Sequence, residues 1–105
     1  MAWDEHSNVI GLGDAEAQME KCIDNIRVIL AAVGGTLDDI VSLTIYFLTR
    51  ADLPAIQRVR ARHFKVNSAP ASILIQVPGL VIPEFLLELV PIAVVPYDRY
   101  QRPSI

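Results

Sequence analysis

The chain has 105 residues, of which 52% are hydrophobic, and a formal net charge of −3 at pH 7. This length fits one small domain, and the acidic balance argues against a general nucleic-acid-binding surface, which is normally basic. A domain of this size buries only about 60–70% of the surface of its unfolded chain, so we expect subunit contacts to cover part of its apolar surface, the alternative being an unusually rich core.

Apolar residues recur at steps of three and four between residues 14 and 33, which predicts a helix with one apolar face. Asp14 is the expected N-cap, and Glu16 is favourably placed in the first turn. Gly34 and Gly35 should end the helix, because glycine adopts the left-handed conformation after a helix at little cost. The apolar face consists of Met19, Cys22, Ile23, Ile26, Ile29, Leu30 and Val33.

Residues 39–49 alternate in character, which predicts a strand. One side, with Val41, Leu43, Ile45 and Phe47, should pack under helices. The other side is semi-polar and suits a partner subunit or a ligand; it carries Ser42, Thr44, Tyr46 and Leu48. Residues 52–66 predict a second, shorter helix, with Pro54 tolerated in its first turn.

Residues 71–77 and 85–95 predict two further strands, and Pro91 should place the second of them at a sheet edge or a bulge. We expect residues 96–105 to form an extended tail, free to lie on a neighbour. Two helices on one face of a small sheet make an α+β architecture. No further helix is available for the other face of the sheet, so we expect neighbouring subunits to cover it.

No uncharged apolar run reaches the about 18 residues of a transmembrane helix. The N-terminus carries Asp4 and Glu5 and lacks the basic and apolar regions of a signal peptide. Cys22 is the single cysteine and cannot form an internal disulfide. We therefore expect a cytoplasmic protein without membrane contact, in which Cys22 is a buried structural thiol rather than a nucleophile.

The order of these elements, together with several short strings, resembles the RidA/YjgF family, also called endoribonuclease L-PSP proteins. The strings are Gly13-Asp14 with Gln18, Asn25-Ile26, Leu30-Ala31-Ala32-Val33-Gly34, Leu37-Asp38-Asp39-Ile40-Val41, Ala69-Pro70-Ala71, and Glu88 with Ile92-Ala93-Val94. The resemblance covers residues 4–95 and implies one chorismate-mutase-like domain over residues 1–95. It also implies a homotrimer with the sheets in a central barrel, the helices outside, and small-molecule clefts between subunits.

Two departures from the family pattern affect the expected site. Family members usually begin with a β-hairpin, and residues 1–4 read like the continuation after it, so we expect either that the hairpin is absent or that the sequence starts at an internal methionine. The imine deaminases of the family carry arginine directly after Pro-Ala, whereas Ser72 follows Pro70-Ala71 here. A guanidinium holds a substrate carboxylate through two charge-assisted hydrogen bonds, so carboxylate affinity should fall unless another group replaces the arginine.

Glu88 matches the acidic residue that, in the family, positions water for attack on an imine carbon. The family reaction hydrolyses an enamine or imine to a ketoacid and ammonia. A carboxylate in an apolar cleft can exchange protons near neutral pH, and Ser72, Thr44 and Tyr46 are the candidate substrate contacts. The alternative is that Glu88 satisfies the backbone or a neighbour's charge at a subunit contact.

Basic residues gather on the second predicted helix: Arg58, Arg60, Arg62, His63 and Lys65. A solvated outer face is the favoured interpretation. The alternative is an RNA contact, but no aromatic stacking residues are interleaved, so a nucleic-acid partner is not expected. His6 and His63 lack partners at metal-ligand spacing, and the glycines at 11 and 13 do not form a dinucleotide loop. We expect no metal and no cofactor.

Three functions remain open on these grounds. The first is an enamine or imine deaminase that uses Glu88. The second is a non-catalytic trimer that binds a small metabolite or acts in regulation, motivated by Ser72 in the arginine position and by the expected loss of the hairpin. The third is RNA binding or cleavage, which the net acidity disfavours. The first two rank equally from the sequence.

Overall fold

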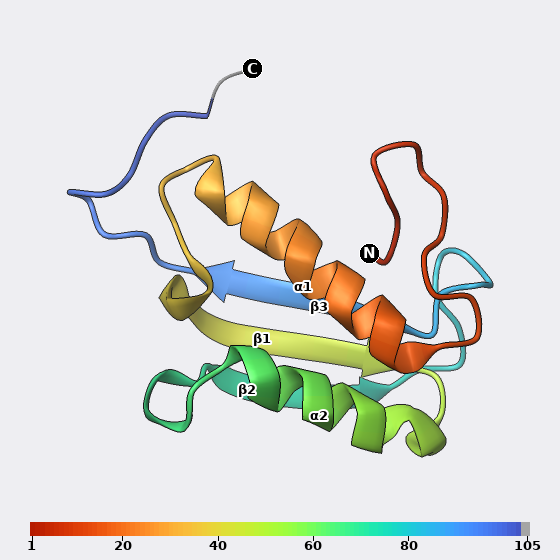
Figure 1. Ribbon diagram of the computed structural model, residues 1–105. Coiled ribbons are helices and arrows are strands. Elements are labelled where there is room, and N and C mark those ends of the chain that lie inside the picture. Colours follow the sequence, from red (N-terminus) through yellow and green to blue (C-terminus); the bar gives the residue numbers. More distant parts are fainter. Residues whose placement is uncertain (104–105) are drawn as a thin grey trace.

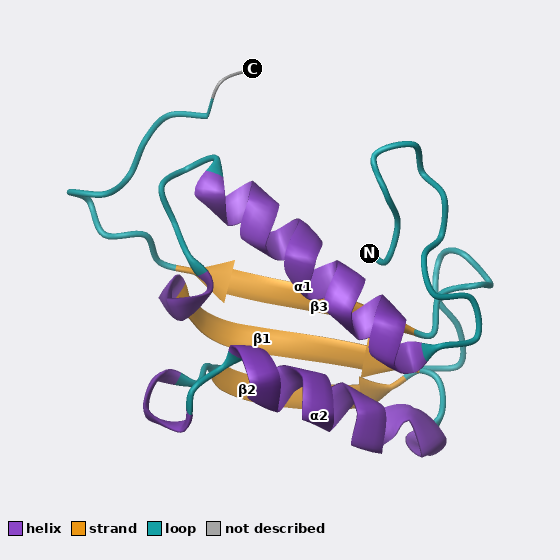
Figure 2. Cartoon of the chain, in the orientation of Figure 1, coloured by secondary structure: helices purple, strands orange, loops and turns teal. Residues whose placement is uncertain are grey.

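The computed structural model describes residues 1–103 and contains a three-stranded sheet with two helices packed on one face (Figures 1 and 2). This arrangement confirms the expected α+β architecture. The helices and strands are α1 (Ala15–Ala31), β1 (Ile40–Phe47), α2 (Leu53–His63), β2 (Ala71–Gln76) and β3 (Leu87–Ala93). Three short 3-10 turns accompany them at Leu37–Asp39, Arg50–Asp52 and Val66–Ser68.

Helix α1 begins where the sequence predicts it. The Asp14 carboxylate accepts a hydrogen bond from the Ala17 backbone N–H at 3.1 Å, which confirms Asp14 as the N-cap. Met19, Cys22 and Ile23 on its apolar face are fully or almost fully buried. Gly34 follows the helix with φ of +82°, the left-handed conformation that glycine adopts most cheaply.

The Asp14 cap is testable by unfolding. We expect Asp14→Ala to lower the free energy of unfolding by about 1 kcal/mol, because the N–H of Ala17 then loses its acceptor at the helix end. Urea unfolding followed by circular dichroism measures this change. Asp14→Asn is the matched control, since its amide oxygen can still accept the hydrogen bond. Equal stability of Asp14→Ala and the wild type would show that the cap contributes nothing.

The sheet has the strand order β2-β1-β3. Strands β1 and β2 are parallel, and the connection between them contains α2, as a parallel pair requires a crossover. Strand β3 pairs with β1 in the antiparallel sense and is an edge strand. This position explains how β3 tolerates Pro91, which cannot donate to a strand ladder, and it confirms the expected edge location.

The two faces of β1 are sorted as predicted at three of four apolar positions. Leu43, Ile45 and Phe47 are buried on the face that carries the helices. The expectation for Val41 is wrong, since its side chain is 49% exposed and Ile40 is buried instead. The cause is an irregularity in the β1–β3 register between Ile40 and Ser42. An extra residue in one strand reverses the alternation of side chains on one side of the bulge.

Gln18 links α1 to the segment that leads into β3. Its side chain is fully buried. The Nε2 group donates to the carbonyl oxygens of Gly11 at 3.2 Å and Glu84 at 2.9 Å, while Oε1 accepts from the Leu86 N–H at 2.8 Å. A buried amide group that makes all these hydrogen bonds holds the bonded backbone groups in one arrangement. Gln18 therefore fixes how the chain enters β3, two residues before Glu88.

The described part of the C-terminal tail lies against its own chain. The Gln101 N–H donates to the carbonyl oxygen of Val33, and the Arg99 guanidinium bonds both the Gly34 carbonyl and the Asp39 carboxylate. Carbonyl groups at the end of a helix need such external donors. The hydrogen bonds from Arg99 hold the pKa of the Asp39 carboxyl below its usual value. Residues 104–105 of the predicted tail lie outside the described part.

Within residues 1–103, no helix is both long enough and apolar enough to cross a lipid bilayer.

Candidate functional site

Three of the four predicted site residues share the face of the sheet that no helix covers, called here the open face. Tyr46 and Glu88 are directly paired across β1 and β3, and Thr44 is paired with Val90 two residues along. Paired residues on one face have Cβ atoms about 5 Å apart. The sheet therefore brings Thr44, Tyr46 and Glu88 together as neighbours.

Apolar side chains surround these three residues on the open face. Ile73 and Ile92 are each 59% exposed, and Val90 is 47% exposed. Ile73 pairs with Thr44 across β1 and β2, so the apolar surface extends over all three strands. Exposed apolar area of this kind usually marks a contact surface.

Glu88 is half-buried and takes part in an ion pair. Its Oε1 lies 3.1 Å from the Met1 amino group. The carbonyl oxygens of Met1 and Trp3 both accept hydrogen bonds from the Asn25 side chain on α1, at 2.8 and 2.9 Å. Asn25 thus holds the N-terminal segment beside β3, where Met1 meets the carboxylate. An ionised Glu88 can accept a proton, which is the property that hydrolytic chemistry needs.

Ser72 lies on the opposite face of the sheet from the other three residues. Its β1 partner is Leu43, which is buried beneath the helices, whereas the flanking Ala71 and Ile73 are exposed. The Ser72 hydroxyl accepts a hydrogen bond from Arg60 Nη1 at 3.2 Å and lies 3.3 Å from the Pro70 carbonyl oxygen. Within one chain, Ser72 is therefore separated from the cluster of Thr44, Tyr46 and Glu88.

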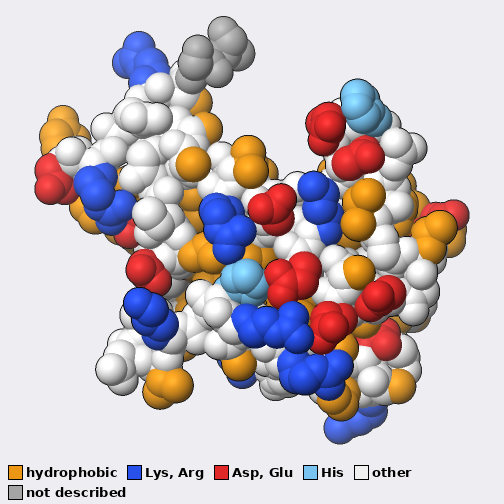
Figure 3. Space-filling view, viewed as in Figure 1, with side chains coloured by type: hydrophobic (Ala, Val, Ile, Leu, Met, Phe, Trp, Pro, Cys, Tyr) orange, Lys and Arg blue, Asp and Glu red, His pale blue; other side chains and the backbone are white. Residues whose placement is uncertain are grey.

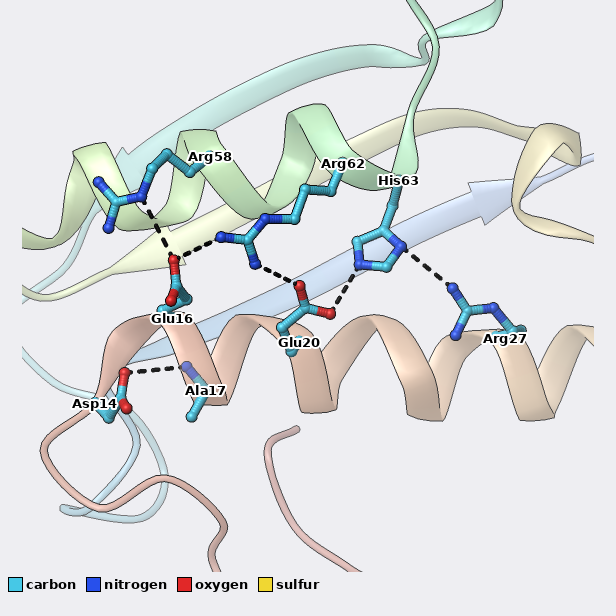
Figure 4. Close-up of polar contacts among 8 residues, drawn as sticks. All are labelled: Asp14, Glu16, Ala17, Glu20, Arg27, Arg58, Arg62 and His63. Carbon is cyan, nitrogen blue, oxygen red and sulfur yellow. Dashed lines mark hydrogen bonds and ion pairs between the residues drawn. The ribbon is translucent and has the colours of Figure 1, made fainter.

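A network of charged residues joins α1 to α2 on the outer surface (Figure 4). Arg62 bonds Glu16 at 2.9 Å and Glu20 at 3.0 Å, and Arg58 lies 3.4 Å from Glu16. His63 Nε2 lies 2.8 Å from Glu20. Partial burial opposes ionisation of Glu20, but hydrogen bonds from His63 and Arg62 outweigh it and hold the pKa of Glu20 below its usual value.

This network bears on the RNA alternative. Arg58 and Arg62 lie one helical turn apart and share Glu16, as their spacing predicts. Figure 3 shows the basic groups interleaved with acidic ones on this face. Cations that are already paired with carboxylates add little attraction for phosphate. Of the basic residues that suggested an RNA contact, Arg58, Arg62 and His63 are therefore engaged in a helix-to-helix ion network.

The sequence indicates the direction of Arg60 but not its partner. Two residues span about 200° around a helix axis, so Arg60 projects away from Arg58 and Arg62 and toward β2. This consequence of the spacing could be seen in the sequence, but the partner Ser72 could not, because it follows from how α2 packs on the sheet.

Cys22 behaves as the sequence predicts for a structural thiol. It is fully buried, and burial raises its pKa to about 11. The thiolate, which is the nucleophilic form, is then scarce at neutral pH. Within residues 1–103, no group of three or more histidine, cysteine, aspartate or glutamate side chains is arranged to hold a metal ion.

Comparisons with known proteins show the family and the fold of the chain. The family model described as Endoribonuclease L-PSP matches residues 1–95. The chain is 39% identical over 90 residues to the 3-aminoacrylate deaminase RutC of Acinetobacter baylyi. This match covers 86% of this chain and 70% of RutC.

Solved structures of other proteins share the fold of this chain. The Rid-family protein YyfB of Yersinia pestis, of unknown function, has a TM-score of 0.80 at 29% identity, covering 90% of this chain and 72% of that one. Yeast Mmf1 has a TM-score of 0.81 at 25% identity, covering 89% and 72%.

Proposed function

Because this chain belongs to the endoribonuclease L-PSP family, also called the Rid/YjgF family, we propose that it hydrolyses reactive 2-imino or enamine acids. The observation that carries the proposal is Glu88, a half-buried residue that is the strand partner of Tyr46 and whose carboxylate lies 3.1 Å from the Met1 amino group. The relative RutC, named as a 3-aminoacrylate deaminase, supports this substrate class.

The proposed chemistry assigns one role to Glu88. Its carboxylate takes a proton from a water molecule while the water oxygen bonds to the imine carbon, and it passes that proton to the nitrogen, which gives a neutral carbinolamine. The carboxylate then takes the hydroxyl proton and delivers it to the nitrogen as the carbonyl of the ketoacid forms, the carbon–nitrogen bond breaks, and ammonia leaves. General base and acid catalysis of this kind contributes about 100-fold to 10,000-fold. Thr44 and Tyr46 supply hydroxyl groups beside Glu88 that can hydrogen-bond substrate or water.

We propose that the active unit is a homotrimer whose sites lie between subunits. The support is the open face, where Ile73, Val90 and Ile92 expose much of their surface to water. Contact between copies of this face would remove that surface from water at about 25 cal/mol per Å². It would also enclose Glu88 in the apolar surroundings that its proposed role requires.

The direct test is release of ammonia or ketoacid from a 2-imino acid generated in situ by an amino-acid oxidase, with 3-aminoacrylate as the second substrate. We expect micromolar protein to accelerate hydrolysis above the rate in buffer. Bovine serum albumin at the same concentration controls for nonspecific amines. Turnover no faster than buffer for both substrates would rule out the deaminase proposal.

A non-catalytic, metabolite-binding trimer is the second candidate, and Ser72 in the arginine position favours it. Under this alternative the wild type is inactive, and Ser72→Arg gains deaminase activity because it restores a guanidinium to an otherwise intact cleft. A wild type with substantial turnover would exclude the alternative.

A further inference from the structure

Arg60 lies on α2 and has no role in the reaction proposed above. Its side chain is half-buried and reaches Ser72, the second residue of β2. Nη1 donates to the Ser72 hydroxyl at 3.2 Å, and Nε donates to the Gln57 side-chain oxygen at 2.8 Å. These two bonds orient the guanidinium against the edge strand of the sheet, since β2 has no neighbour on its outer side within residues 1–103.

The charge environment of Arg60 differs from that of the other paired arginines. Arg62 and Arg58 contact carboxylates of α1, and Arg99 contacts Asp39. Within the described chain, the hydrogen bonds of Arg60 go only to the neutral groups of Ser72 and Gln57. A partly desolvated guanidinium without a carboxylate partner has unused electrostatic attraction for an anion.

The donors that remain on Arg60 suit a carboxylate in particular. The bonds to Ser72 and Gln57 leave further N–H groups on Nη1 and Nη2 unused. The planar guanidinium presents these donors in the fork that matches two carboxylate oxygens. The short serine at position 72 matters here, because its hydroxyl accepts from Arg60 and leaves room for the guanidinium beside the strand.

We propose that Arg60, held in place by Ser72, binds the carboxylate of the substrate. A guanidinium from α2 thereby replaces the one that the family resemblance expects at position 72. This inference rests on the proposed function, since it names the group that recognises the carboxylate of a 2-imino acid. Ser72 is then a positioning residue that acts through Arg60.

The positions of Arg60 and Glu88 also indicate whether one subunit or two would form a complete site. Strands β2 and β3 lie on opposite sides of β1, about 10 Å apart. Ser72 faces the helices, whereas Glu88 pairs with Tyr46 on the open face. A small 2-imino acid cannot bridge Arg60 and Glu88 of the same chain across the sheet. One site must therefore combine Arg60 of one subunit with Glu88 of another.

A binding experiment tests the role of Arg60 without requiring turnover. Pyruvate, a stable 2-oxo acid, is titrated into the protein while backbone amide shifts are followed by NMR. We expect Arg60→Gln to weaken pyruvate binding by about tenfold or more, since it removes charged hydrogen bonds. Arg60→Lys should weaken it less, because it keeps the charge without the fork. Arg58→Gln, on the same helix but paired with Glu16, is the matched control and should bind like the wild type.

The outcomes separate this inference from the proposed function. Turnover by the wild type together with unchanged pyruvate affinity in Arg60→Gln would overturn the role of Arg60 and leave the deaminase intact. Pyruvate binding that depends on Arg60, in a wild type without turnover, would support the carboxylate site while the deaminase fails. A wild type that binds no pyruvate at millimolar concentration would also overturn the inference. Melting temperatures of all variants confirm that each remains folded.

Subunit mixing tests the shared site. We expect Arg60→Gln and Glu88→Gln to be nearly inactive alone. After they are unfolded together at equal amounts and refolded, random assembly should restore about one quarter of wild-type activity, because that share of the heterologous interfaces carries both native residues. Mixing without refolding is the control. No recovery in refolded mixtures that do contain both chains would show that the two residues do not complete one site across subunits.

Discussion

Replacement of Glu88 by glutamine should lower kcat for imino-acid hydrolysis by about 100-fold or more, because the amide keeps the size of the side chain but cannot take a proton from water. The effect should fall mainly on kcat, since the amide still occupies the same place beside Tyr46 and should leave substrate affinity nearly unchanged. Steady-state kinetics on a 2-imino acid generated in situ would give both parameters.

The control for this substitution is Glu84→Gln, which removes one negative charge from an exposed position in the loop before β3. Its kinetics should match those of the wild type. The ion pair between Glu88 and the Met1 amino group is also lost in Glu88→Gln, so the melting temperature of both variants needs to be compared. An active Glu88→Gln enzyme with a normal melting temperature would remove Glu88 from the mechanism and leave it a structural partner of the N-terminus.

Local patterns in the sequence were sufficient to predict the elements of the fold. The three-to-four spacing and the Asp14 cap predicted α1, and Pro91 predicted an edge strand. Such patterns involve residues that are close together in the chain, so they can be recognised without knowledge of the tertiary contacts. The wrong prediction for Val41 has a non-local cause. The bulge depends on how β1 pairs with β3, and the sequence of β1 alone does not indicate it.

The candidate site was predictable to a smaller extent. Alternation along the strands placed Thr44 and Tyr46 together on one face, and the register then added Glu88. Ser72 could not be placed, because the face that it occupies depends on its alignment with Leu43 in a neighbouring strand. In the sequence, Gln18 stands out only as part of a family string. A polar residue beside Met19 on the buried side of a helix was nevertheless a signal that it bonds buried backbone groups.

Substitution of Ile92 by aspartate should convert the protein from the proposed trimer to a monomer, because the new carboxylate would be desolvated within the proposed subunit contact. Ile92 is 59% exposed on the open face and pairs with Ser42 on β1. Burial of an unpaired charge costs several kcal/mol in a folded protein, and the penalty would recur once in every subunit of the assembly. Sedimentation velocity at several protein concentrations would measure the change in mass.

The matched control is Val66→Asp, which introduces the same charge at an apolar side chain that is 95% exposed and lies outside the sheet. Val66→Asp should keep the mass of the wild type. A monomeric wild type would contradict the proposed assembly, and so would a trimeric Ile92→Asp. Because Arg60 and Glu88 of one chain cannot reach the same small substrate, deaminase activity should disappear together with the trimer. A monomeric Ile92→Asp variant that retains full turnover would therefore show that catalysis does not need the trimer and that the whole site lies within one subunit.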